Sequence, residues 1–222
     1  MPRVELDLTS GSILRWLLLC GVLAPAFMVG FVVASALMTS DHSYLSATVS
    51  QLGTSGREYA SVMNSGFVLC GVLVIPFAYG LYCRLGRNYA AKALWILLTV
   101  DGIGTILIGM FHADSVLLGG TATFEGDLHG IFAGIAYLAL VIGMVVFAVA
   151  VHRRPEWRGF MQASAVAVVI NSAILLVFFL GFYEAFEGGL QLAFFGTAML
   201  WMEAVAVRSL RQTAQAHEYD TF

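Results

Sequence analysis

The stretch LHGIFAGIAYLALVIGMVVFAVAV, from Leu128 to Val151, contains no Asp, Glu, Lys or Arg. A helix of about 20 apolar residues is long enough to cross the hydrocarbon core of a bilayer, which is about 30 Å thick. Five other apolar runs are also long enough, and they lie at Ile13–Met38, Val62–Tyr82, Ala93–Met110, Phe160–Phe182 and Leu190–Val207. The sequence therefore predicts an all-α integral membrane protein, a bundle of six transmembrane helices.

The composition of the chain supports this class. Of its 222 residues, 59% are hydrophobic and only 11% are charged, whereas a typical soluble protein has about 25% charged residues. The net charge of −3 indicates no polyanionic partner. A nucleic-acid binder, a disordered tail and a disulfide-rich secreted module are therefore excluded. Because no polar segment is long enough for a second domain, residues 1–222 are predicted to form a single transmembrane domain whose partner is the lipid bilayer.

The basic residues are divided unevenly between the two faces of the predicted bundle. With the N-terminus inside, ten of the eleven basic residues lie on the inner face, and only Arg57 lies on the outer face. The ten are Arg3, Arg15, Arg84, Arg87, Lys92, Arg153, Arg154, Arg158, Arg208 and Arg211. Because basic residues favour the cytoplasmic side, we predict that both termini are cytoplasmic, in a multi-pass protein of the cell membrane.

Two polar loops on the outer face, Thr39–Ser61 and Phe111–Asp127, are longer than the other connections. In the first, Ser43–Leu52 is predicted to form a short helix on the membrane surface that ends at Gly53. Loops of this length between helices usually serve a function. We therefore expect the two loops to pack together as a lid over the bundle.

Small residues are expected to bring the helices together, because close packing rather than apolar burial drives helix association in lipid. Gly130 and Gly134 form a GxxxG pair in the fourth helix, and Gly102, Gly104 and Gly109 give the third helix a thin face. Both sets are predicted to be packing faces.

Asp101 lies near the middle of the third apolar run, where an ionised carboxylate costs about 2.5–3.5 kcal/mol. Its carboxyl group must therefore be protonated, paired or in contact with water. Asn171, at the middle of the fifth run, is a candidate hydrogen-bond partner, and Thr99 and Thr105 are local alternatives. Asp101 is either part of an interhelical hydrogen bond that fixes the packing, or a proton donor or ligand anchor in a cavity.

Imidazoles and carboxylates gather at the outer ends of the third and fourth helices, as His112-x-Asp114 and Asp127-x-His129. These ligand types suit zinc or a similar divalent ion, so the four residues are candidate metal ligands. The alternative interpretation is structural. Asp127 would then complement the helix dipole, and Asp114 beside His129 would form a clasp between two helix ends.

The first outer loop adds two further candidates. Ser50 is a candidate nucleophile within plausible reach of His112 or His129, although no GxSxG elbow frames it. Tyr44, together with Asn171 in the fifth helix, is a candidate ligand-binding residue.

Several short motifs resemble those of one known family. They are the Gly21…Pro25 opening of the first helix, HSYLSATVSQLG (His42–Gly53), the Gly66 and Gly71 region, Phe111-His112-Ala113-Asp114, and Leu128-His129-Gly130. From about Gly21 to Met202, the chain resembles the bacterial and archaeal membrane family known only as domain of unknown function 998. The resemblance implies a six-helix membrane bundle and no established activity. Members more often have proline where His112 stands, which makes that metal ligand optional.

Three functions remain open at this point. The first is binding of a lipid or small hydrophobic molecule through the outer-face polar cluster. The second is an intramembrane enzyme, a metal-dependent lipid hydrolase or a terpene-cyclase-like protein, that uses Asp114, His129 and Asp101. The hydrolases it distantly resembles, of the ceramidase and adiponectin-receptor type, carry an additional HxxxH in a late helix, which this chain lacks. The third is a small proton-coupled transporter with Asp101 as its proton site.

Overall fold

Six long helices make up most of the computed structural model, which describes residues 11–40, 42–114, 121–180 and 186–219. They are α1 (Gly11–Met38), α2 (Ala60–Arg84), α3 (Tyr89–Met110), α4 (Phe124–Val151), α5 (Phe160–Leu180) and α6 (Glu187–Tyr219). Two short 3-10 helices, η1 (Val49–Gly53) and η3 (Pro155–Trp157), lie in connecting loops. Within this described part, all six long helices are long and apolar enough to cross a membrane, so the predicted all-α class is confirmed.

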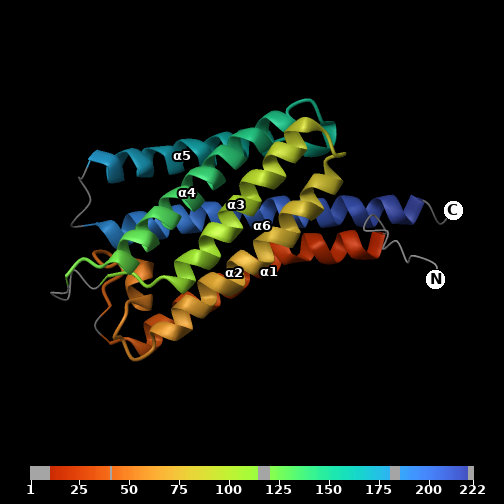
Figure 1. Ribbon diagram of the computed structural model, residues 1–222. Coiled ribbons are helices and arrows are strands. Elements are labelled where there is room, and N and C mark those ends of the chain that lie inside the picture. Colours follow the sequence, from red (N-terminus) through yellow and green to blue (C-terminus); the bar gives the residue numbers. More distant parts are fainter. Residues whose placement is uncertain (1–10, 41, 115–120, 181–185, 220–222) are drawn as a thin grey trace.

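The helices form a closed ring in which neighbours in sequence are neighbours in space. Each helix packs against the next, and α6 returns to pack against α1 (Figure 1). We call the end that carries the connections α1–α2, α3–α4 and α5–α6 the loop end. The opposite end, where α1 begins and α6 finishes, is the terminal end. Because the ring closes, its interior is bounded by all six helices.

Glycines allow α3 to approach both of its neighbours. A Cβ built on Gly102 would lie 3.0 Å from the carbonyl oxygen of Gly71 in α2, and one on Gly109 would lie 2.5 Å from that of Asn64. On the other side, a Cβ on Gly104 would lie 2.9 Å from the Cβ of Ala136 in α4. The predicted packing face of α3 is therefore confirmed for Gly102 and Gly109, whereas Gly104 packs on the other side of the helix.

The GxxxG pair of α4 behaves differently. Gly130 and Gly134 are both exposed, and a Cβ on either would have no neighbouring atom within 4 Å. The prediction that they form a packing face within this chain is wrong. The reason is the rotation of α4, which presents Ala136 rather than these glycines to α3.

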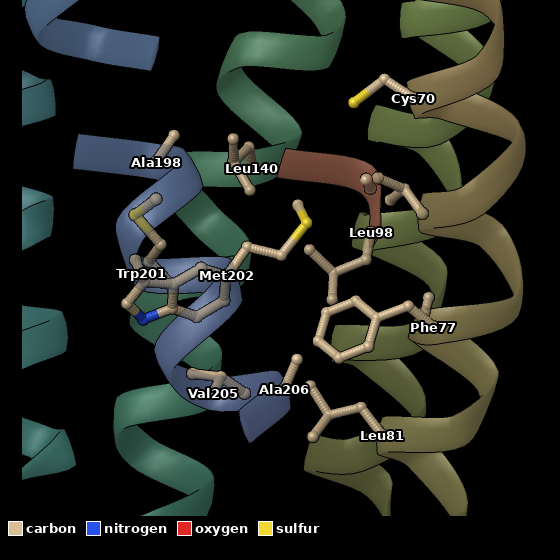
Figure 2. Close-up of a cluster of buried hydrophobic side chains, with 14 of the residues drawn as sticks. Cys70, Phe77, Leu81, Leu98, Leu140, Ala198, Trp201, Met202, Val205 and Ala206 are labelled. Atoms are coloured by element: carbon tan, nitrogen blue, oxygen red, sulfur yellow. The ribbon is translucent and has the colours of Figure 1, made fainter. Parts of the chain in front are cut away.

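Toward the terminal end, apolar side chains fill the interior of the ring. Met202 and Ala206 of α6 face Phe77 and Leu81 of α2, and all four are buried (Figure 2). This packing separates the terminal end from the more open region nearer the loop end.

Hydrogen bonds at the terminal end explain why α6 extends past the predicted limit at Val207. The main-chain oxygen of Glu156, in η3, accepts hydrogen bonds from Arg208 Nε and Nη2 at 3.0 and 2.6 Å and from Gln212 Nε2 at 2.8 Å. Gln212 Oε1 in turn accepts from Arg84 Nη2 at 2.6 Å. These bonds tie the polar extension of α6 to the neighbouring turns, which hydropathy alone does not reveal.

Candidate functional site

A cavity of about 220 Å³ lies inside the ring and is lined by residues from all six helices and from η1. On α6 its lining runs from Gln191 to Met202, which at 1.5 Å per residue corresponds to about 16 Å along the helix axis. The lining is mostly apolar and is rich in aromatic rings, namely Phe67, Tyr137, Phe178, Phe194 and Phe195. The fold therefore holds a narrow, largely apolar space at membrane depth.

Asp101 is the one acidic residue in this lining. It shares one face of α3 with Thr105 and Ile108, because residues four and seven positions apart lie on the same side of a helix. Only 6% of Asp101 is exposed, and no hydrogen bond joins its carboxyl group to any other residue in the described part of the chain. The carboxyl group is thus available to whatever occupies the cavity.

The structure does not bring Asn171 to Asp101. The Asn171 side chain donates through Nδ2 to the carbonyl oxygen of Ala167 on its own helix, at 2.8 Å. Its main-chain oxygen accepts from the Tyr137 hydroxyl at 2.5 Å. The buried Asn171 is not part of the cavity lining, so it joins α4 to α5 and does not partner Asp101.

The loop end of the cavity is closed by η1. Gln191 of α6 accepts a hydrogen bond from Val49 N at 2.5 Å and donates to Ser50 Oγ at 3.4 Å. Ser50 and Gln191 both line the cavity. They therefore form a second polar position in the cavity, near the start of α6.

The short helix in the first loop differs from the prediction. It spans five residues, Val49–Gly53, and is capped by Thr48, whose side chain accepts a hydrogen bond from Gln51 N. Asn64 Nδ2 of α2 donates to the carbonyl oxygen of Gly53 at 2.9 Å. A Cβ on Gly53 would lie 2.1 Å from Asn64 Oδ1, so the absence of a side chain at this position lets η1 dock on α2.

The first loop also packs on the start of α6. Gly189 N donates a hydrogen bond to the carbonyl oxygen of Leu45 at 3.0 Å. A Cβ built on Gly188 would lie 2.2 Å from the carbonyl oxygen of Ala47. Tyr44 is exposed and its ring stands edge-on to His42, with ring centroids 5.1 Å apart. Tyr44 is thus outside the cavity lining. Residues 115–120 of the second loop lie outside the described residues, and the predicted two-loop lid stays a prediction.

The candidate metal ligands at the loop end form links between α3 and α4 instead of one cluster. His112 contacts Glu125 Oε1 through its main-chain nitrogen at 2.8 Å and through Nδ1 at 2.5 Å. Asp114 accepts from Thr123 N and Thr123 Oγ1 at 2.9 and 2.7 Å. These bonds hold the pKa of Asp114 below its usual value. His129, which is buried, contacts the carbonyl oxygen of Phe111 through Nδ1 at 2.8 Å.

Asp114 thus takes its hydrogen bonds from Thr123 and not from His129, although His129 is close enough to help lower the pKa of Asp114. Asp127, the fourth candidate, is exposed. Among the residues that the structure describes, no group of three or more His, Cys, Asp or Glu side chains is placed to hold a metal ion. Glu125, which was not among the candidates, is the partner of His112 because α4 begins four residues before Leu128.

The cavity borders the outside of the ring beside α4. Gly134 lines the cavity and is also exposed, and one turn nearer the loop end Gly130 is equally open. The missing side chains leave the wall thin at this point, within the apolar part of the helix. We therefore expect a lateral route into the cavity, if there is one, to pass Gly134.

The fold and cavity define a multi-pass, six-helix membrane protein. The family described as "Protein of unknown function (DUF998)" matches residues 22–208, and the chain belongs to this family, as its motifs indicated. Comparisons with the curated proteins and with the solved structures gave no match.

Proposed function

We propose that this protein binds a small amphipathic molecule in the cavity between its six helices. The observation that carries the proposal is Asp101, a buried carboxyl group that lines a largely apolar cavity without a hydrogen bond to the rest of the described chain. A buried polar group without a partner is unfavourable, so it indicates that a ligand or water completes the site. Apolar walls with a few polar groups are typical of small-molecule sites.

The ligand site is thus inside the ring of helices and not at the outer-face polar cluster that the sequence suggested. His112, Asp114 and His129 link the ends of α3 and α4, whereas Asp101 and Ser50 line the cavity. An intramembrane enzyme or a proton-coupled transporter would use the same Asp101, and no separate observation favours either. Binding is therefore the function that the geometry supports best.

We further propose that the terminal end faces the cytoplasm. Every described basic residue except Arg57 lies in the half of a helix, or in the turn, nearest that end. Positively charged residues favour the cytoplasmic side of a membrane. The Ser50 end of the cavity would then face the outer leaflet.

Native mass spectrometry of protein purified in a mild detergent tests the binding proposal. Ala198 is buried and lines the cavity, so Ala198→Leu fills part of it, whereas the exposed Ala193 on the same helix gives a matched control in Ala193→Leu. We expect a bound small molecule on the wild type and on Ala193→Leu, and its loss from Ala198→Leu. Equal occupancy in all three proteins would place the ligand elsewhere and refute the proposal.

A further inference from the structure

We infer that the ligand is an organic cation, an alkylammonium compound whose charged nitrogen pairs with Asp101 and whose hydrocarbon part lies among the aromatic rings. This inference rests on the proposed function, since it names the chemical class that the cavity takes. It follows from three properties of the lining: its charge, its hydrogen-bonding groups and its rings.

The charge of the lining favours a cation. Asp101 is an acid, and no Lys, Arg or His is among the residues that line the cavity. A bound anion would therefore meet a carboxyl group with no basic side chain to offset it. A cation would supply the opposite charge that the described chain does not provide to Asp101.

The hydrogen-bonding capacity of the site points the same way. An ionised carboxylate only accepts hydrogen bonds, and an ammonium group only donates them. Other polar groups of the lining are already engaged in part, because the Tyr137 hydroxyl donates to the Asn171 carbonyl oxygen and Gln191 holds η1. A ligand with several N–H donors therefore complements Asp101 better than one with none, and charge-assisted bonds of this kind are the stronger ones.

The aromatic rings supply the rest of the recognition. The ring centroids of Tyr137 and Phe194 are 4.0 Å apart, those of Phe194 and Phe195 are 5.4 Å apart, and those of Phe195 and Phe67 are 6.4 Å apart. The series runs from α4 through α6 to α2, and all four rings belong to residues that line the cavity. Aromatic faces attract ammonium groups through their negative quadrupole, and they bury hydrocarbon at the same time.

The size of the cavity limits the ligand. An apolar cavity of about 150 Å³ is known to accept benzene, and this one is about 220 Å³. One ring with a short alkyl chain is therefore a suitable probe. The compounds 3-phenylpropylamine, 3-phenylpropanol and 3-phenylpropionate share this shape, and at pH 7.5 they are a cation, a neutral molecule and an anion.

Binding of the three probes to purified protein by isothermal titration calorimetry tests the inference. We expect the amine to bind at least tenfold more tightly than the alcohol, and the propionate not to bind detectably. Asp101→Asn should lower the affinity for the amine at least tenfold and leave the affinity for the alcohol within about threefold, because only the charge is lost. Asp127→Asn, which removes an exposed carboxylate outside the cavity, should change neither.

The outcome separates this inference from the proposed function. If the alcohol or the propionate binds as tightly as the amine, or if Asp101→Asn keeps the preference for the amine, the cation assignment is overturned. Loss of alcohol binding in Ala198→Leu would still support a ligand cavity in that case. A failure of the amine to bind overturns the assignment as well. Should Asp101→Asn fail to fold, the ranking of the three probes on the wild type decides.

Discussion

Replacement of Gly71 by alanine tests the helix contact that positions Asp101. A Cβ on Gly71 would lie 2.3 Å from the carbonyl oxygen of Gly102 and 2.9 Å from the main-chain nitrogen of Ile106, both in α3. Ordinary contacts begin at 3.4 Å, so α3 would have to move by about 1 Å. Because Gly102 follows Asp101, this shift also displaces one wall of the cavity.

The magnitude of the effect follows from two opposing contributions. Overpacking costs about 1–3 kcal/mol, and a clash with backbone, which cannot rotate away, belongs in the upper part of that range. Replacing a helical glycine by alanine stabilises the helix by about 1 kcal/mol. We therefore expect a net loss of about 2 kcal/mol, which for a chain of this length lowers the melting temperature by about 4–8 °C.

Thermal unfolding in nonionic detergent measures this loss, and Gly30→Ala is the matched control. Gly30 lies in α1 with no atom within 4 Å of its Cβ position, so alanine there should leave the melting temperature unchanged or raise it slightly. A Gly71→Ala protein as stable as the control would refute the close contact between α2 and α3.

Three further predictions concern access to the cavity, the loop end and the orientation. Gly134→Leu should slow the binding of 3-phenylpropylamine in stopped-flow measurements without lowering the melting temperature, since the side chain enters open space beside the cavity; unchanged kinetics would exclude this lateral route. Hydrogen bonds from Thr123 lower the pKa of Asp114 from 3.8, so the stabilisation is present above pH 3.8 and is lost as the pH falls through the lowered value. The melting temperature of the wild type should therefore fall more steeply as the pH is lowered than that of Asp114→Asn. Parallel plots of melting temperature against pH would contradict this account. Reporter fusions after Val151 and Gly188 should give cytoplasmic and external signals respectively, whereas signals from one side would contradict the orientation.

The sequence predicted the six helices because a run of about 20 apolar residues has few alternatives to a membrane-spanning helix. It predicted the end of α4 at Val151, but not where α4 begins or where α6 begins and ends. Thr123 caps α4 by accepting from Gly126 N at 3.0 Å, and bonds to Glu156 support the polar extension of α6. These boundaries depend on hydrogen bonds between side chains and backbone and not on hydropathy.

The candidate site was predicted in part. Asp101 was a candidate because it is an acid within an apolar run, and Ser50 because it is a serine in the first polar loop. Both line the cavity. Gln191 was missed, although a polar side chain in the first turn of the last apolar run was a visible signal. Glu125 was missed because its pairing with His112 depends on the register between two helix ends, which one sequence does not specify.

The most direct test of the central claim is an experimental structure of the protein bound to 3-phenylpropylamine. The account predicts density for the amine inside the ring, with its nitrogen about 2.7–2.9 Å from a carboxylate oxygen of Asp101 and its phenyl ring in contact with Phe194 or Phe195. Density for the amine at the outer surface of the helices, with none beside Asp101, would contradict the account.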